Sequence, residues 1–231
     1  MKRFVSMEEI SDGRLYGADD MVRAGCGGCE GCSACCETMA DTIFLDPLDV
    51  FRMMQGLDRS FASLMADRIQ LDMADCFLLP RIKTEPGQSR CPFLNEAGRC
   101  SIHRFRPGFC RLFPLGRFYE NRSFRYFLQT GECRLAGRTK VKVRKWIDTP
   151  DLERYETFVS DWHYLLRDLE ASMAPGDAGA VRRITLALLE TFYAAPYRLE
   201  EDFYPQFYER FLAFRKQQLP GAPDPTADAS C

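Results

Sequence analysis

The sequence predicts an α+β fold, with a small cysteine-rich metal-binding core, a short antiparallel sheet and helices, followed by a C-terminal helical subdomain. Three observations predict it. Cysteines cluster in the first two thirds of the chain, strand-like segments bounded by turn residues lie among them, and from residue 151 apolar residues recur with helical spacing. The expected parts are a polar, poorly ordered segment at 1–22, a metal-binding domain at 23–150, helices at 151–219 and a disordered tail at 220–231.

The first elements follow the cysteine run. Residues 42–45, Thr-Ile-Phe-Leu, predict a short strand. Asp46 stands where a helix N-cap is expected, with Pro47 at the first helical position. The apolar residues of this helix share one face, namely Leu48, Phe51 and Met54. A second helix is expected at about residues 60–70.

Strand signals return in the middle of the chain. Residues 76–83 predict a strand, and Pro80 places it toward a sheet edge. Residues 112–119 and 123–130 predict a hairpin with its turn at Glu120-Asn121. Between these elements, residues 91–100 form a small turn with a cysteine at either end.

Three helices are expected after residue 151. Spacings of three and four residues define the apolar face of the first, formed by Leu152, Tyr155, Val159, Trp162, Leu166, Leu169 and Met173. Pro175-Gly176 ends it, a second helix covers about 180–193, and a third covers about 199–219 with a possible kink at Pro205. None of them contains a cysteine, so we interpret them as a packing scaffold or as the surface for a protein partner.

Charge is unevenly distributed along the 231 residues, although the net charge is only −2. Residues 81–145 carry 16 Lys and Arg against 4 Asp and Glu, and residues 134–145 are the most basic run. Such a block is typical of nucleic-acid binding or of a shell that neutralises metal-bound thiolates. Because cysteines lie inside the block, we favour the second interpretation over nucleic acid.

The sequence also indicates the compartment. No window has the roughly 18 uninterrupted apolar residues of a membrane-spanning helix. The first residues, Met1 to Glu9, become acidic before any apolar segment of a secretory signal develops. We therefore expect a cytoplasmic protein with no membrane association, in a reducing environment where clustered cysteines usually bind metal or catalyse.

The cysteines fall into two groups. Cys26, Cys29, Cys32 and Cys35 recur every third residue, and Cys36 is adjacent to Cys35. A Cys-x-x-Cys loop lets two sulfurs converge on one metal, whereas adjacent cysteines form only strained disulfides. The second group follows at turns and strand ends, and consists of Cys91, Cys100, Cys110 and Cys133.

Three cysteines stand apart from the expected ligands. Cys76 heads an apolar strand and is interpreted as a small buried hydrophobic residue. Cys231 ends the tail and is interpreted as incidental. Cys26 fits the triplet spacing but lies outside the denser run from Cys29 to Cys36, so whether it binds metal stays open.

The segment Cys29-Glu-Gly-Cys32-Ser-Ala-Cys35-Cys36 resembles the Cys-x-x-Cys-x-x-Cys-Cys signature of the YkgJ-type cysteine-cluster family, a zinc- or iron-chelating domain. Cys91-Pro-Phe-Leu, residues 100–114 and Gly131-Glu-Cys133 resemble its later motifs. The resemblance implies eight metal ligands: Cys29, Cys32, Cys35, Cys36, Cys91, Cys100, Cys110 and Cys133. His103 stands where the family usually has tyrosine, and it either ligates or replaces an aromatic packing residue.

The sequence leaves two candidates for the metal, an iron–sulfur cluster and zinc, because all-sulfur ligation suits both. The serial Cys-x-x-Cys run with a distant Cys-Pro is similar to ferredoxin arrangements, and an anionic [4Fe–4S] cluster would match the basic segment. We therefore expect iron–sulfur, with zinc as the alternative. Arg106 and Arg111 flank Cys110 and are candidates to donate hydrogen bonds or charge to cofactor sulfur, or else to form surface ion pairs.

The expected function is that of a metal protein with a redox, carrier or accessory role rather than an enzyme. The resemblance adds one enzymatic alternative, because some members are flagellin lysine N-methylases that use S-adenosylmethionine. The chain has neither a Gly-x-Gly-x-x-Gly turn nor the Cys-x-x-x-Cys-x-x-Cys motif of radical enzymes. Its two histidines, His103 and His163, belong to no recognisable hydrolytic motif.

Overall fold

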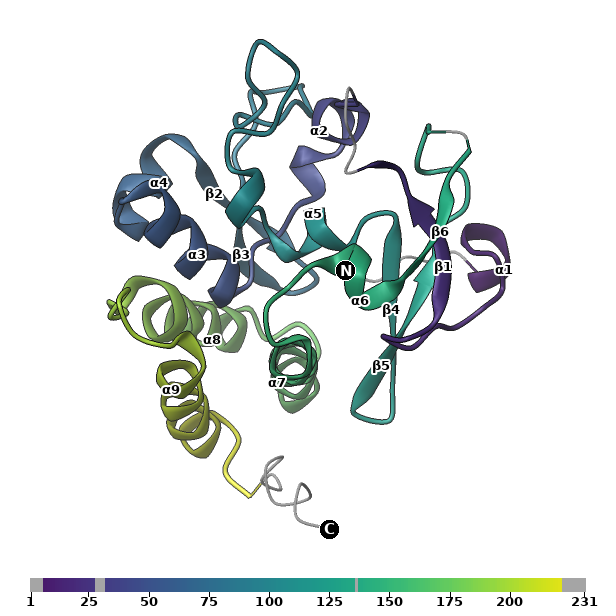
Figure 1. Ribbon diagram of the computed structural model, residues 1–231. Helices are drawn as coiled ribbons and strands as arrows, with labels where there is room; N and C mark the ends of the chain where they lie inside the picture. The colour runs from purple at the N-terminus through teal and green to yellow at the C-terminus, as the bar shows by residue number, and fades with distance from the viewer. Residues whose placement is uncertain (1–5, 28–31, 136, 222–231) are drawn as a thin grey trace.

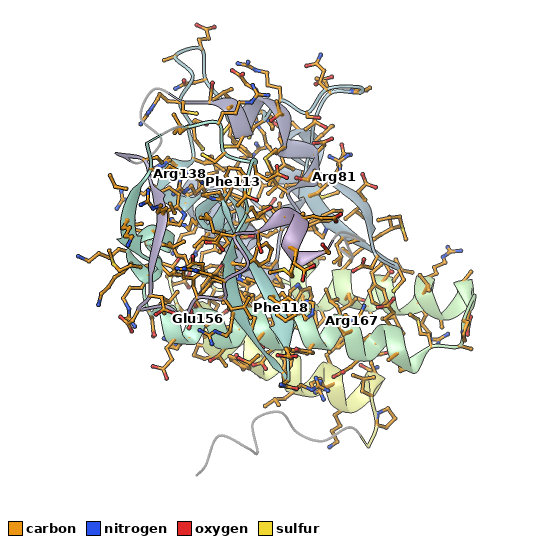
Figure 2. The ribbon with its side chains drawn as sticks, turned by 90° about the vertical axis from the view of Figure 1, so that its right-hand side faces the viewer. Arg81, Phe113, Phe118, Arg138, Glu156 and Arg167 are labelled. Atoms are coloured by element: carbon orange, nitrogen blue, oxygen red, sulfur yellow. The ribbon has the colours of Figure 1, made fainter. Side chains whose placement is uncertain are left out.

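The computed structural model describes residues 6–27, 32–135 and 137–221. In these ranges the chain forms short antiparallel sheets and helices, which confirms the predicted α+β class. Figure 1 shows the C-terminal helices α7, α8 and α9 at the bottom of the molecule, with the cysteine-bearing helix α2 at the top. Figure 2, turned by 90°, shows the same lower layer of helices, which carries Arg167, beneath the strands that carry Arg81 and Phe118.

The described strands pair in three separate two-stranded sheets. Each sheet is antiparallel, and two of the three are hairpins of consecutive strands. The pairs are β1 (Met21–Gly25) with β6 (Thr139–Lys142), β2 (Ile69–Ala74) with β3 (Phe77–Ile82), and β4 (Leu115–Glu120) with β5 (Ser123–Leu128).

The predicted hairpin at 112–130 is confirmed as β4 and β5, with two local differences. Its turn residues are Asn121 and Arg122, whose φ angles of 51° and 59° define a two-residue turn that suits the twist of a hairpin. The strands are also shorter than predicted, because Gly108–Leu112 form a short helix, α5, so that β4 begins only at Leu115, and β5 ends at Leu128.

The helix predicted after Asp46 is confirmed as α3 (Pro47–Leu57). The Asp46 carboxylate accepts from the Asp49 N–H at 2.8 Å, and the Asp49 carboxylate accepts from the Asp46 N–H at 3.4 Å. This reciprocal capping box satisfies two donors at the start of the helix. The predicted apolar face is buried, with Leu48, Phe51 and Met54 all in the core.

Two predictions near α3 were wrong. The strand predicted at 42–45 does not form, because residues 40–42 make a 3₁₀ helix, η2 (Ala40–Thr42), and Phe44 makes only an isolated bridge to Arg81 of β3. The helix expected at 60–70 is α4 (Phe61–Asp67), because Ile69 already pairs with Ile82 in the next sheet. Long-range strand pairing therefore overrides the local helical pattern.

The segment expected to be poorly ordered is structured where it is described. A short helix, α1 (Met7–Ile10), is followed by bridges from Ser11 to Gln129 and from Tyr16 to Tyr126. Tyr16 is buried against the β4–β5 hairpin. The expected disorder after residue 221 and the assignment of Cys231 concern residues outside the described ranges.

The three predicted C-terminal helices are confirmed. They are α7 (Leu152–Ser172), α8 (Ala178–Leu189), which continues into a π-helical segment η4 (Glu190–Ala194), and α9 (Phe203–Gln218). The predicted kink is wrong, because α9 starts at Phe203 and Pro205 lies in its first turn. A proline costs no helical hydrogen bond there, since the first N–H groups have no partner within a helix.

The C-terminal helices and the cysteine-bearing part share one continuous hydrophobic core. Edge-to-face contacts join Phe158 to Phe207 and Trp162 to Phe192 inside the helical layer. The Tyr193 hydroxyl donates to the Leu45 carbonyl oxygen at 3.0 Å and so ties this layer to the start of α3. The boundary at residue 150 stays a prediction, as does the partner surface on these helices.

In the described ranges, no helix combines the length and the apolar character that crossing a membrane requires.

We predict a pH dependence of stability from His163 on α7. Its ring stacks on Tyr119 of β4 at a centroid distance of 3.6 Å, and burial lowers the pKa of His163 to about 4. In the unfolded chain the pKa is about 6.5, so the unfolded state binds the extra proton first as the pH falls. The stabilisation by neutral His163 is therefore complete above about pH 6.5 and is lost as the pH falls toward 4.

Urea denaturation at about pH 7.5 and about pH 5 measures this contribution. The wild-type midpoint should fall more between the two conditions than the midpoint of His163→Phe, which keeps an aromatic ring but cannot titrate. Equal losses in the two proteins would contradict the prediction.

Candidate metal centre

A cavity of about 230 Å³ lies where the two groups of cysteines meet. Six thiols, none of them in a disulfide, line it. They come from both halves of the predicted set and are Cys32, Cys35, Cys36, Cys91, Cys100 and Cys110. The structure thus brings together residues that are far apart in the sequence, as the cysteine pattern predicted.

Backbone hydrogen bonds hold the two groups side by side. Cys35 and Cys36 lie on α2 (Ala34–Thr38), and the Cys91 N–H donates to the Cys36 carbonyl oxygen at 2.7 Å. A second bond joins the Ala40 N–H to the Ser89 carbonyl oxygen at 3.0 Å. Because backbone atoms make both bonds, the meeting of the segments does not depend on the thiols themselves.

The turn from residue 91 to residue 100 presents a thiol at each end. The Asn95 N–H donates to the Arg99 carbonyl oxygen at 2.9 Å, and Leu94 forms a β-bridge with Cys100. The Ser101 N–H then bonds the Phe93 carbonyl oxygen at 2.8 Å. These bonds close the loop and direct its two cysteines into the same cavity.

Helix α5 positions Cys110, and α3 positions α5. The Asp49 carboxylate, besides its part in the α3 cap, accepts from the Gly108 N–H at 2.7 Å at the start of α5. Gly108 packs so closely against the Tyr155 hydroxyl that a Cβ atom there would overlap it. The site is therefore built from α2, the loop at 91–100 and α5, with α3 and α7 behind it.

The thiols differ in their pKa. Burial raises the pKa values of Cys91, Cys100 and Cys110. A hydrogen bond from the Cys36 thiol lowers the pKa of Cys35 to about 6, and the same bond raises the pKa of Cys36. Most of these thiols therefore keep their protons without metal, and a metal that binds them must displace protons.

Arg106, one of the two predicted arginines, lines the cavity. Its positive charge contributes to lowering the pKa of Cys35 and opposes the rise in the pKa of Cys100. Its Nη1 donates to His103 Nε2 at 2.8 Å, and partial burial together with the Arg106 charge lowers the pKa of His103. That ring nitrogen of His103 is therefore occupied by Arg106.

Arg111, the other predicted arginine, does not line the cavity. It is buried, and its guanidinium donates to three backbone carbonyl oxygens, of Arg104 at 2.5 Å, Asp148 at 2.9 Å and Arg106 at 3.3 Å. It is neither a donor to the thiols nor a surface ion pair. Its contacts hold the loop before α5 against the end of α6 (Val143–Ile147).

Part of the basic segment forms ion pairs within the described part of the chain. Arg144 pairs with Asp19 at 2.7 Å, Arg122 with Asp168 at 2.9 Å, and Arg81 with Asp72 at 2.7 Å. The acidic partners come from the flanking regions, which carry the excess of Asp and Glu. Arg99 and Arg106 are the lysine or arginine residues that line the cavity in the described ranges.

Cys133 lies apart from the main cavity. It lines a smaller hollow of about 30 Å³ together with Cys26, Cys32 and Cys35. Cys76, interpreted as a packing residue, is partly buried against the core and lines a different cavity. Cys29 lies outside the described residues.

The donor set fits a soft metal. Six thiols and one imidazole line the main cavity, and no carboxylate of the described residues does, which suits zinc or iron–sulfur and not magnesium or calcium. Over 6–27, 32–135 and 137–221, no three cysteine, histidine or acidic side chains are close enough to hold one ion as they stand. Binding therefore requires the loops to draw the thiols together, as is usual where metal binding is coupled to folding.

The sequence did not point to three residues that shape the site. Asp49 looked like an ordinary first-turn helix residue, and its contact with Gly108 spans 59 positions. Phe113 and Trp146 line both hollows, and the Trp146 indole donates to the carbonyl oxygens of Leu112 and Phe113 at 3.2 Å. Phe113, labelled in Figure 2, is half-buried. A tryptophan whose N–H is shielded from water needs a hydrogen-bond partner, which is a signal that the sequence offers. Trp146 was still missed as a site residue, because it lies far from the cysteines in the sequence.

Comparison of the sequence with models of known protein families finds a match. Residues 28–134 match the CxxCxxCC family, described as "Putative zinc- or iron-chelating domain". No curated protein and no solved structure matches the chain.

We predict that Asp49→Ala destabilises the protein and weakens its metal binding. The substitution leaves the buried Gly108 N–H without its acceptor, which costs about 1–3 kcal/mol, and it releases the helix that carries Cys110. Urea denaturation and metal content after purification measure the two effects. Glu96→Ala, an exposed substitution in the loop at 91–100, is the control and should change neither. An Asp49→Ala protein with wild-type stability would contradict the role given to this contact.

Proposed function

Residues 28–134 are a domain of the CxxCxxCC family, and on that premise we propose that the main cavity holds an iron–sulfur cluster. The proposed ligands are Cys36, Cys91, Cys100 and Cys110, the four cysteines that line this cavity and not the smaller hollow. When bound, the cluster would supply one-electron chemistry or be carried to another protein. The proposed role is that of a redox, carrier or accessory protein.

The gathering of thiols from separate segments around one cavity carries this proposal. Cys36 comes from α2, Cys91 and Cys100 from the ends of one turn, and Cys110 from α5. Four thiolates are the usual ligand set of a [4Fe–4S] cluster, and ligands from separate segments are common in such sites. Core packing alone does not require cysteines from so many segments around one space.

The size of the cavity favours a cluster over a single ion. Its volume of about 230 Å³ is several times the ~30 Å³ that one water molecule occupies in the liquid. A four-iron cluster with four thiolates is an anion, and Arg106 and Arg99 line the same cavity to balance it. Apolar walls, including Ile43, Phe93 and Ile102, shield the site from water and so strengthen these charge interactions.

The family resemblance implies four further cysteine ligands, which are not among the proposed cluster ligands. Cys32 and Cys35 lie between the two hollows and can reach either. Cys133 faces the smaller hollow. Cys29 stays a predicted ligand on the resemblance alone.

Anaerobic purification of the full chain tests the proposal. Iron and acid-labile sulfide should be present in about equal amounts, together with the broad visible absorption of an iron–sulfur cluster. Cys110→Ala should lower the iron content about tenfold or more, because it removes a ligand from a fixed helix. Cys76→Ala, a change at a partly buried cysteine in another cavity, should leave iron and sulfide unchanged.

A colourless protein that contains zinc and no sulfide would replace this proposal by the zinc alternative. A protein without metal, in either air or its absence, would overturn both. Circular dichroism of Cys110→Ala shows whether a loss of iron follows from a local change or from unfolding, and Cys100→Ala at the exposed turn gives an independent second variant.

A further inference from the structure

We infer that Cys26, Cys32, Cys35 and Cys133 form a second metal site, which takes a single zinc ion beside the cluster cavity. This inference rests on the proposed function, because it assigns the cysteines that the cluster does not use. It includes Cys26, which precedes the residues matched by the family.

The four cysteines line one small hollow. Its volume is about 30 Å³, and its walls include Phe113 and Trp146, which also line the main cavity. The two hollows are therefore neighbours with shared aromatic walls. Cys32 and Cys35 border both, whereas Cys26 and Cys133 border the small one alone.

Strand pairing fixes Cys26 in this place. Cys26 directly follows β1, whose last residue, Gly25, pairs with Thr139 at the start of β6. A Cβ atom at Gly25 would lie 3.1 Å from the Thr139 carbonyl oxygen and would overlap its side-chain oxygen, so a glycine is needed for this approach. The chain that leads into β6 contains Cys133, and the pairing therefore brings both cysteines to one end of the same sheet.

The volume of the hollow and the thiols that line it indicate which metal it would bind. A volume of about 30 Å³ exceeds the ~10–15 Å³ that is enough to hold one water molecule, so the hollow has room for one ion, and it is much smaller than the main cavity. Four thiolates in tetrahedral arrangement are a standard structural zinc site. Such a site carries two negative charges. Arg134 lines the hollow and can balance one of them, although Glu132 lines it as well.

Among the described residues, the cysteines that line the two hollows divide into two sets of four. The main cavity keeps four cysteines of its own, and the small hollow gains its four from its own two and the two at the boundary. Each site then draws ligands from both halves of the cysteine pattern. No thiolate has to serve two metals.

Metal analysis of the full chain tests this second site. Wild-type protein should contain about one zinc ion per chain in addition to iron and sulfide. Cys26→Ala should lose the zinc and keep iron and sulfide, and Cys133→Ala should do the same. Cys76→Ala is the matched control and should keep all three. Zinc-edge X-ray absorption of the wild type should show four sulfur ligands at about 2.3 Å.

The outcomes separate the two proposals. Iron and sulfide without zinc in the wild type, or zinc retained in Cys26→Ala, would overturn the second site and leave the cluster in place. Loss of iron together with zinc in Cys26→Ala would assign Cys26 to the cluster and also overturn it. A protein with two zinc ions and no sulfide would overturn the cluster, and a fall to one ion in Cys26→Ala would still support the second site.

Discussion

The backbone bond from the Cys91 N–H to the Cys36 carbonyl oxygen is the contact on which the rest of the site depends. It joins two segments that are separated by more than 50 residues and places the thiols of α2 beside those of the loop at 91–100. Loop closure over such a distance has an entropic cost, which the shared hydrophobic core offsets. The proposed metal would therefore bind to segments that already lie side by side, and only the last approach of the thiols would be left to it.

The sequence was most informative where the signals were local. Asp46 and Pro47 predicted the start of α3, the apolar spacing predicted α7, and two strand-like runs around a Glu-Asn turn predicted the β4–β5 hairpin. In each case the residues that determine the element lie within it. The gathering of the cysteines was also predictable, because so many thiols at Cys-x-x-Cys spacing have few other uses in a reducing environment.

Features that depend on distant contacts could not be predicted in this way. Tyr16 is ordered by pairing with Tyr126, and no pattern within its own polar segment indicates that bridge. Leu112 was predicted to begin a strand, but it ends the helix α5, whose first N–H, that of Gly108, donates to the distant Asp49 carboxylate. The separation of Cys133 from the main cavity follows from the β1–β6 pairing, which joins segments more than 100 residues apart.

The contacts of Arg111 have a consequence for the charge balance of the interior. Its guanidinium donates to backbone carbonyl oxygens, and the Asp148 carboxylate favours its charge without a hydrogen bond between the two side chains among the described residues. An arginine keeps its charge at all accessible pH values, so a fixed positive charge remains inside the fold, one residue from Cys110. A cofactor that brings net negative charge to the neighbouring thiols gives this residue a counterion. In the proposed cluster-bound form, the negative charge of the centre would therefore stabilise this buried cation.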